Sequence, residues 1–144
     1  MNKKTSIKQI LRKTKCNWQE SFQGISPEIL RVHRISTHLR QNLELVLTEY
    51  DLQAAEFSVL ETVRKEPLPY CLSPTELSTA MLFSSGGLTK VLNRLFIRGF
   101  ITRLDNPNDK RGKLVQLTES GDQQINKVIV KLHSQEQKKM SILS

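Results

Sequence analysis

The segment from Leu72 to Leu77 is the feature that most constrains the fold, because it fixes the start of a short helix. Ser73 stands at the N-cap position, Pro74 at the first helical position and Glu76 at the third. A serine and a glutamate at this spacing form a capping box, in which each side chain accepts a hydrogen bond from the backbone of the other. Leu72 and Leu77 occupy the positions of a hydrophobic staple. The sequence therefore predicts that the chain enters this helix at one defined angle.

A second helix is predicted directly after the first, from Ser85 to about Ile97, with Ser84 as its N-cap. Apolar residues at helical spacing predict its core face: Leu88, Val91, Leu92 and Leu95. The opposite face presents polar or small residues: Gly86, Thr89, Lys90 and Asn93, with Arg94 at the border. Gly99 supplies the stop at the C-terminal end.

The start of this second helix holds two glycines, Gly86 and Gly87. Inside a helix each costs about 1 kcal/mol relative to alanine. We interpret them as allowing the helix N-terminus to approach a phosphate backbone closely. The alternative is that they relieve crowding between the two helices.

A basic hairpin is predicted next. Residues 100–104 and 114–117 have the composition of short strands. The connection between them is rich in turn formers and cations: Asn106, Pro107, Asn108, Asp109, Lys110, Arg111, Gly112 and Lys113. Two short helices followed by a hairpin with a long basic tip predict a winged helix-turn-helix.

Helices are predicted on either side of this region. Ser26-Pro27-Glu28 marks the start of a long helix that runs to about residue 50, and Gln53 to about Lys65 forms another. Thr118-Glu119 caps a last helix that extends to about Gln137 or beyond. The apolar stripe over 32–50 and the apolar face over 125–132 predict a two-fold homodimer, because one lobe offers them too little partner surface.

The distribution of charge points to a partner that carries phosphates. The net charge is +8, and residues 1–15 contain six cations and no acid. Residues 84–113 contain seven cations and two acids, whereas residues 16–83 have a net charge of −4. A basic arm and a basic segment on a near-neutral body favour a nucleic-acid partner, and the alternative is an ordinary solvated basic surface.

The predicted fold class is mainly α with a small β-hairpin wing (α+β), a winged helix-turn-helix framed by long dimerisation helices. The expected organisation has four parts: a basic N-terminal arm over 1–25, a dimerisation helix over 26–51, a DNA-binding lobe over 52–117 and a C-terminal dimerisation helix over 118–144. Within the arm, only the pair Trp18 and Phe22 has helical spacing; we expect the rest to be irregular.

The hairpin carries a more specific pattern. Residues Asp109 to Thr118 contain D-x-R, five residues and then L-T, and Glu119-Ser120-Gly121 follow as a helix start with glycine. This pattern resembles the wing signature of the MarR family of bacterial transcription regulators. The stretches 73–78 and 88–99 also resemble the family's helix-turn-helix, so the resemblance covers about residues 52–121.

The resemblance implies a ligand-responsive repressor that binds a palindromic operator as a dimer in the cytoplasm. It implies DNA contacts from ten residues: Ser84, Ser85, Gly86, Thr89, Lys90, Asn93, Arg94, Lys110, Arg111 and Lys113. Asp109 would pair with Arg111 and fix the wing tip. A crevice between the dimer bundle and the DNA-binding lobe would hold a small aromatic or phenolic effector, with His33, Thr37 and Arg40 as candidate liners. Family members usually carry a further C-terminal helix, so we expect either a dimer bundle that is shorter by that helix or a natural chain that continues beyond Ser144.

Other functions are less well supported by the sequence. An enzyme is not expected, because the chain has no Gly-rich phosphate loop, no nucleophile elbow and no H-E-x-x-H motif. No cofactor is expected, and no apolar run approaches the 18 residues of a membrane span. A redox or metal sensor that uses Cys16, His33 and His38 remains an alternative, as does a winged helix used only for protein contacts. We expect both Cys16 and Cys71 to be free thiols.

Overall fold

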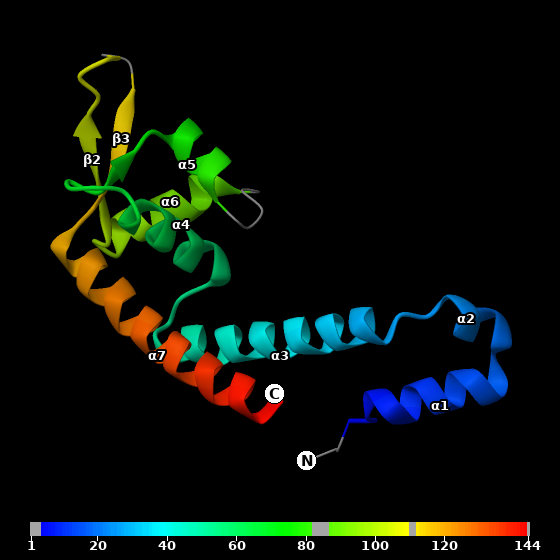
Figure 1. Ribbon diagram of the computed structural model, residues 1–144. Helices are drawn as coiled ribbons and strands as arrows, with labels where there is room; N and C mark the ends of the chain where they lie inside the picture. The colour runs from blue at the N-terminus through cyan, green and yellow to red at the C-terminus, as the bar shows by residue number, and fades with distance from the viewer. Residues whose placement is uncertain (1–3, 82–86, 110–111, 144) are drawn as a thin grey trace. The chain divides into compact units, whose positions relative to one another are not determined.

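The computed structural model describes residues 4–81, 87–109 and 112–143 (Figure 1). The chain divides into two compact units, residues 1–41 and 42–144. The division falls inside the long helix α3 (Pro27–Glu49), so each unit contains part of that helix. None of the helices in the described ranges is long and apolar enough to cross a membrane.

The first unit contains α1 (Ile7–Asn17), α2 (Gln19–Gly24) and the first part of α3. The expectation that most of the arm is irregular is therefore wrong. A capping box starts α1: the backbone N of Gln9 donates to Ser6 Oγ at 3.1 Å, and the backbone N of Ser6 donates to Gln9 Oε1 at 3.0 Å. Arg34 of α3 donates to the carbonyl of Thr5 at 2.9 Å and holds the start of α1.

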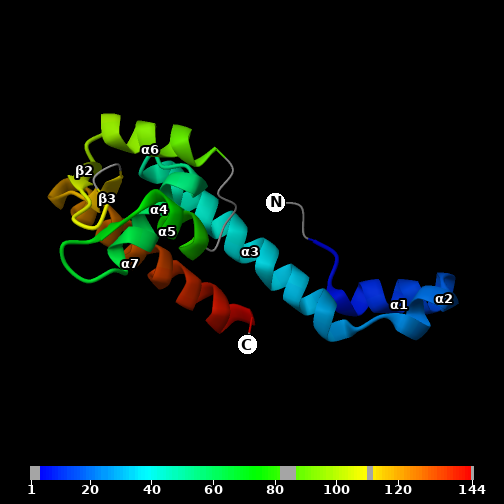
Figure 2. The ribbon, with the colours of Figure 1, turned by 90° about the horizontal axis from the view of Figure 1, so that it is seen from above.

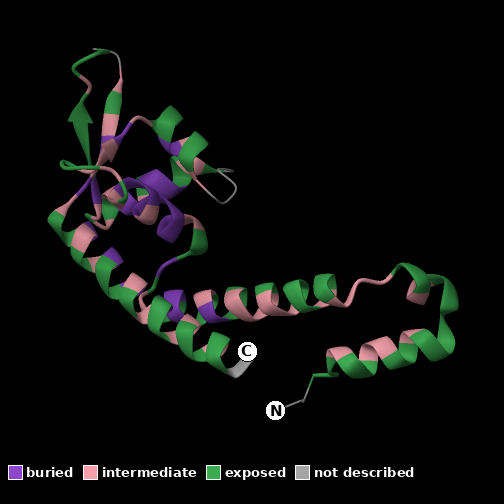
Figure 3. Ribbon diagram, in the orientation of Figure 1, coloured by how far each residue is buried: buried purple, intermediate pink, exposed green. Residues whose placement is uncertain are grey.

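The second unit is built around α4 (Ala54–Arg64), which contacts α5 (Pro74–Ala80), α6 (Leu88–Ile97) and α7 (Glu119–Leu143). Most buried residues of the described chain lie in this unit, many of them on α4 (Figure 3). The most deeply buried side chains are apolar, apart from Asn42: Val46, Val59, Leu60, Val63, Leu77, Leu95 and Val128. This core fixes α6 on α4, and Figure 2 shows the two helices from above.

A three-stranded antiparallel sheet completes the second unit, with the order β1–β3–β2. The predicted hairpin is confirmed: β2 (Ile101–Asp105) pairs with β3 (Lys113–Leu117). The sequence did not predict β1 (Cys71–Leu72), because two residues are too few to show strand periodicity. By pairing with β3, β1 ties the entrance of α5 to the hairpin.

The predicted helix starts are confirmed at α5 and α7. The backbone N of Glu76 donates to Ser73 Oγ at 3.1 Å, and the backbone N of Ser73 donates to Glu76 Oε2 at 2.9 Å. At α7, the backbone N of Gly121 donates to Thr118 Oγ1 at 3.0 Å. Local side-chain chemistry alone was sufficient to locate both starts.

The predicted start of α6 is wrong, because Gly87 was expected inside the helix and instead precedes it. Gly87 is the N-cap residue and has a left-handed conformation with φ 73°. Apart from its chain neighbours, no atom of the described residues lies within 4 Å of a Cβ built on it, so crowding by those residues does not explain this glycine. The positive φ explains it, because glycine adopts that region without steric cost. Ser84, Ser85 and Gly86 lie outside the described residues.

Candidate nucleic-acid interface

The outward face of α6 carries the polar residues that the sequence placed there. Thr89, Lys90 and Asn93 are exposed, whereas Val91 and Leu92 on the other side of the helix are buried. An α-helix with exposed donors on one face fits the width of the DNA major groove. The structure thus brings three of the predicted DNA contacts onto one continuous helix face.

A groove of about 260 Å³ separates α6 from the hairpin. Thr89 and Asn93 line it from α6, and Arg103 and Lys113 line it from β2 and β3. The sequence reasoning missed Arg103 as a site residue and counted it only in the net charge. Its guanidinium lies 4.6 Å from the centre of the Phe96 ring, which keeps the charge beside α6.

The hairpin positions Lys113 opposite an acid. Lys113 and Asp105 are register partners at the end of the β2–β3 ladder, and the Lys113 ammonium forms an ion pair with the Asp105 carboxylate. Both side chains are exposed, so the pair is screened by solvent and remains open to exchange for a phosphate. Lys113 therefore contributes less net charge to the surface than the sequence suggests.

The tip of the hairpin is shaped by short-range hydrogen bonds. The backbone N of Asn108 donates to Asn106 Oδ1 at 3.0 Å, and the backbone N of Gly112 donates to the Asp109 carbonyl at 3.1 Å. Lys110 and Arg111 lie outside the described residues, and so does the predicted pairing of Asp109 with Arg111. Their roles remain predictions.

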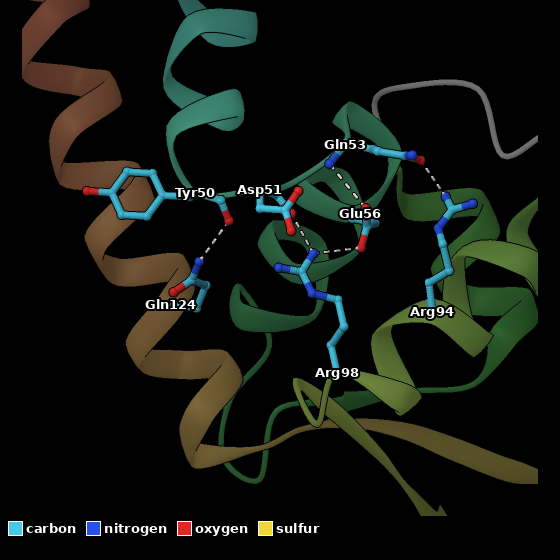
Figure 4. Close-up of polar contacts among 7 residues, drawn as sticks. All are labelled: Tyr50, Asp51, Gln53, Glu56, Arg94, Arg98 and Gln124. Atoms are coloured by element: carbon cyan, nitrogen blue, oxygen red, sulfur yellow. Dashed lines mark hydrogen bonds and ion pairs between the residues drawn. The ribbon is translucent and has the colours of Figure 1, made fainter.

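Arg94 lies differently from the other predicted contacts on α6. It is half-buried, and its Nη2 donates to Gln53 Oε1 at the start of α4, over 2.7 Å (Figure 4). Its Nε atom is buried and has no hydrogen-bond partner among the described residues. The side chain is directed toward the start of α4 (Figure 4).

Arg98, which the sequence reasoning did not single out, has a similar orientation. Its Nη1 donates to the Asp51 carbonyl at 2.6 Å and to Glu56 Oε2 at 3.2 Å (Figure 4). Arg94 and Arg98 are four residues apart and so occupy the same side of α6. A helical-wheel analysis of α6 could have shown this shared side, but not the partners on α4.

The candidate effector residues lie on α3, and the candidate sensor residues lie on α1 and α3. His33 and Arg40 are exposed, and the Thr37 hydroxyl donates to the His33 carbonyl at 3.0 Å, a common contact within a helix. Cys16 is exposed and Cys71 half-buried, and both are free thiols. Within the described ranges, no group of three or more His, Cys, Asp or Glu side chains could hold a metal ion, so Cys16, His33 and His38 do not form such a group.

Comparison with known proteins identifies the family. A model of the MarR family matches residues 50–112. The multiple antibiotic resistance protein MarR of Escherichia coli is 40% identical over 106 residues, which cover 71% of this chain and 72% of that protein. The regulator PecS of Dickeya dadantii is 34% identical over 96 residues, 67% of this chain and 58% of PecS.

Solved structures agree with the sequence relatives. The crystal structure of a mutant of E. coli MarR complexed with operator DNA has a TM-score of 0.62 and 34% identity, and the match covers 82% of this chain and 85% of that chain. Wild-type E. coli MarR in its apo form has a TM-score of 0.65 at the same identity, covering 80% and 86% of the two chains. The chain therefore belongs to the MarR family of winged helix-turn-helix transcription regulators, which bind DNA.

Proposed function

We propose that the chain is a repressor that binds a palindromic DNA operator as a homodimer, with α6 in the major groove and the β2–β3 hairpin on the adjacent backbone. The observation that carries the proposal is the groove in which Thr89 and Asn93 face Arg103 and Lys113. One wall offers groups suited to base edges and the other offers cations suited to phosphates.

The hairpin tip extends the same surface along the DNA. Lys110 and Arg111 belong to the connection between β2 and β3, next to Lys113 in sequence. A narrow minor groove concentrates negative potential and attracts an inserted arginine. Arg111 in the minor groove and Asn93 in the neighbouring major groove would then anchor one half-site.

Dimerisation is supported by apolar side chains that are exposed in a single chain. Leu45 on α3 and Val130 on α7 are each 68% exposed, and Val32 on α3 is 64% exposed. A second copy of the chain would cover such residues, since folded proteins rarely leave apolar helix faces open. A two-fold dimer requires operator half-sites about one helical turn apart.

Control by a small aromatic acid is supported by a second cavity, of about 730 Å³, between the end of α4 and α7. Ile125 and Ile129 provide apolar surface, His133 provides a polar group for a carboxylate or a phenol, and a ligand carboxylate would compete with Glu61 for the Lys65 ammonium. His33, Thr37 and Arg40, which the family resemblance implied, are not among the residues that line this cavity. A ligand bound there would weaken DNA affinity by about 1–3 kcal/mol, the usual size of an allosteric coupling.

Selection of bound fragments from random DNA tests this function. The protein is expected to enrich an imperfect palindrome at two salt concentrations, and salicylate or 4-hydroxybenzoate in the binding step is expected to reduce the yield. Recovery of DNA without any enriched sequence would contradict operator binding. An enriched palindrome that no phenolic acid affects would leave operator binding intact and remove the effector proposal.

A further inference from the structure

Four side chains form a hydrogen-bonded clamp between the start of α4 and the recognition helix α6: Gln53, Glu56, Arg94 and Arg98 (Figure 4). Arg94 Nη2 donates to Gln53 Oε1 at 2.7 Å, and Arg98 Nη1 donates to Glu56 Oε2 at 3.2 Å. The two halves are joined at α4, because the backbone N of Gln53 donates to Glu56 Oε1 at 3.1 Å. The clamp therefore holds α6 at two points that are one helical turn apart.

The clamp also includes the turn between α3 and α4. Arg98 Nη1 donates to the carbonyl of Asp51, which has a left-handed conformation with φ 52°. On the other side of this turn, Gln124 Nε2 of α7 donates to the Tyr50 carbonyl at 3.4 Å. The same short turn is thus held both by the recognition helix and by the long C-terminal helix.

The clamp arginines differ from the proposed DNA contacts of α6 in being bonded to Gln53, Glu56 and the Asp51 carbonyl. Asn93 and Lys90 are exposed, whereas Arg94 and Arg98 are half-buried and directed toward α4. One Nη2 hydrogen of the Arg94 guanidinium is bonded to Gln53 and its Nε is buried, so two of its five donors are already withdrawn from a phosphate and one of them ties α6 to α4. Arg94 therefore has the geometry of a residue that sets the position of α6.

We infer that Arg94 and Arg98 are positioning residues for operator selection, and that Gln53 and Glu56 are the acceptors through which they act. A small rotation of α6 would displace Asn93 from a base edge, whereas contacts to phosphates tolerate such a shift. The inference rests on the proposed binding of DNA by α6. The family resemblance implied Arg94 as a DNA contact. In this inference Arg94 instead holds the helix that makes the contacts.

The test compares Gln53→Ala, Arg94→Ala and the double variant, with Lys90→Ala as the matched control from the exposed face of the same helix. Each full-length protein is titrated against two duplexes at four salt concentrations. One duplex carries the sequence that the wild-type protein selects from random DNA, and the other is a scrambled duplex of equal composition. Thermal melting of each variant verifies that it is folded.

The positioning role predicts that Gln53→Ala and Arg94→Ala each weaken binding to the selected duplex about tenfold, roughly the loss of one charged hydrogen bond. Binding to the scrambled duplex and the log–log salt slope should not change. The double variant should be no weaker than the weaker single variant, because both remove the same bond. Lys90→Ala should weaken both duplexes and reduce the slope by about one.

Two results would overturn the inference. If Arg94→Ala reduces the salt slope by about one and Gln53→Ala has no effect, Arg94 is a phosphate contact and operator binding by α6 stands. If Lys90→Ala and Arg94→Ala both leave every affinity unchanged, α6 does not face DNA, and the proposed function fails together with the inference. Should Arg94→Ala fail to fold, unchanged selectivity of Gln53→Ala would still refute the positioning role.

Discussion

Glu56 and Arg98 form an asymmetric ion pair: the Glu56 side chain is 4% exposed and the Arg98 side chain 28%. Removing the arginine leaves a carboxylate buried without its cation, whereas removing the acid leaves a guanidinium that water can reach. Removal of the partner that leaves a buried charge uncompensated causes the larger loss of stability. The two partners should therefore differ in what their loss does to stability.

We predict that Arg98→Ala lowers the free energy of unfolding by about 3 kcal/mol, and that Glu56→Gln lowers it by about 1 kcal/mol. The pair between exposed Lys65 and half-buried Glu61 at the end of α4, with an N–O distance of 2.6 Å, provides the control. Lys65→Ala should cost less than about 0.5 kcal/mol. Urea unfolding of the three variants measures these differences, and equal losses for Arg98→Ala and Lys65→Ala would contradict the buried role of the pair.

Gly121 is required by close packing at the start of α7. A Cβ atom there would lie 2.1 Å from the carbonyl oxygen of Phe100, which is backbone and cannot rotate away. We predict that Gly121→Ala lowers the free energy of unfolding by roughly 3 kcal/mol, at the upper end of overpacking effects. Gly24→Ala, where a Cβ would meet nothing within 4 Å, should be close to neutral. Calorimetry that finds both variants as stable as the wild type would exclude this contact.

At the scale of elements, α6 carries the proposed sequence specificity. Asn93 is exposed on the face that borders the hairpin groove, and its amide can donate to and accept from a base edge. We predict that Asn93→Ala costs about 1–3 kcal/mol on the selected duplex and relaxes specificity at one position per half-site. Repeating the DNA selection with this variant measures the effect; an unchanged preferred sequence would show that Asn93 reads no base.

The hairpin is proposed to contribute charge in place of specificity. Arg111→Ala should weaken binding to most sequences and make the log–log salt slope shallower by about one. Lys113→Ala should change the slope less, because Asp105 already pairs with the Lys113 ammonium. Titrations at several salt concentrations compare the two variants. A larger change in the salt slope for Lys113→Ala than for Arg111→Ala would contradict the prediction.

The elements that sequence analysis located well are those with local start and stop signals. Ser73 with Glu76, Thr118 with Gly121 and the turn formers after Asp105 all act within a few residues, so the sequence contains the whole signal. The helix α1 was missed because the segment was interpreted by its charge alone, although Ile7, Ile10 and Leu11 have helical spacing and Ser6 and Gln9 form a capping box. The partners of Arg94 and Arg98 could not be predicted, because Gln53 and Glu56 are more than 40 residues away in sequence.

At the scale of the whole molecule, the exposed apolar residues require a partner surface. Leu45→Glu places a charge on the apolar face of α3, where the wild-type leucine is 68% exposed. We predict that the wild type sediments as a dimer at tens of micromolar and that Leu45→Glu shifts it toward the monomer. The control Glu44→Gln changes an exposed neighbour and should leave the dimer intact. A monomeric wild type would exclude this interface.

The central claim is that α6 and the hairpin form one DNA-binding surface. The most direct test is the salt dependence of binding by the double variant Lys90→Ala/Arg111→Ala, which removes one cation from α6 and one from the connection between β2 and β3. We predict that the log–log slope of the double variant on the selected duplex is shallower than the wild-type slope by about two, with an unchanged melting temperature. A wild-type slope and affinity in the double variant would show that this surface does not contact DNA.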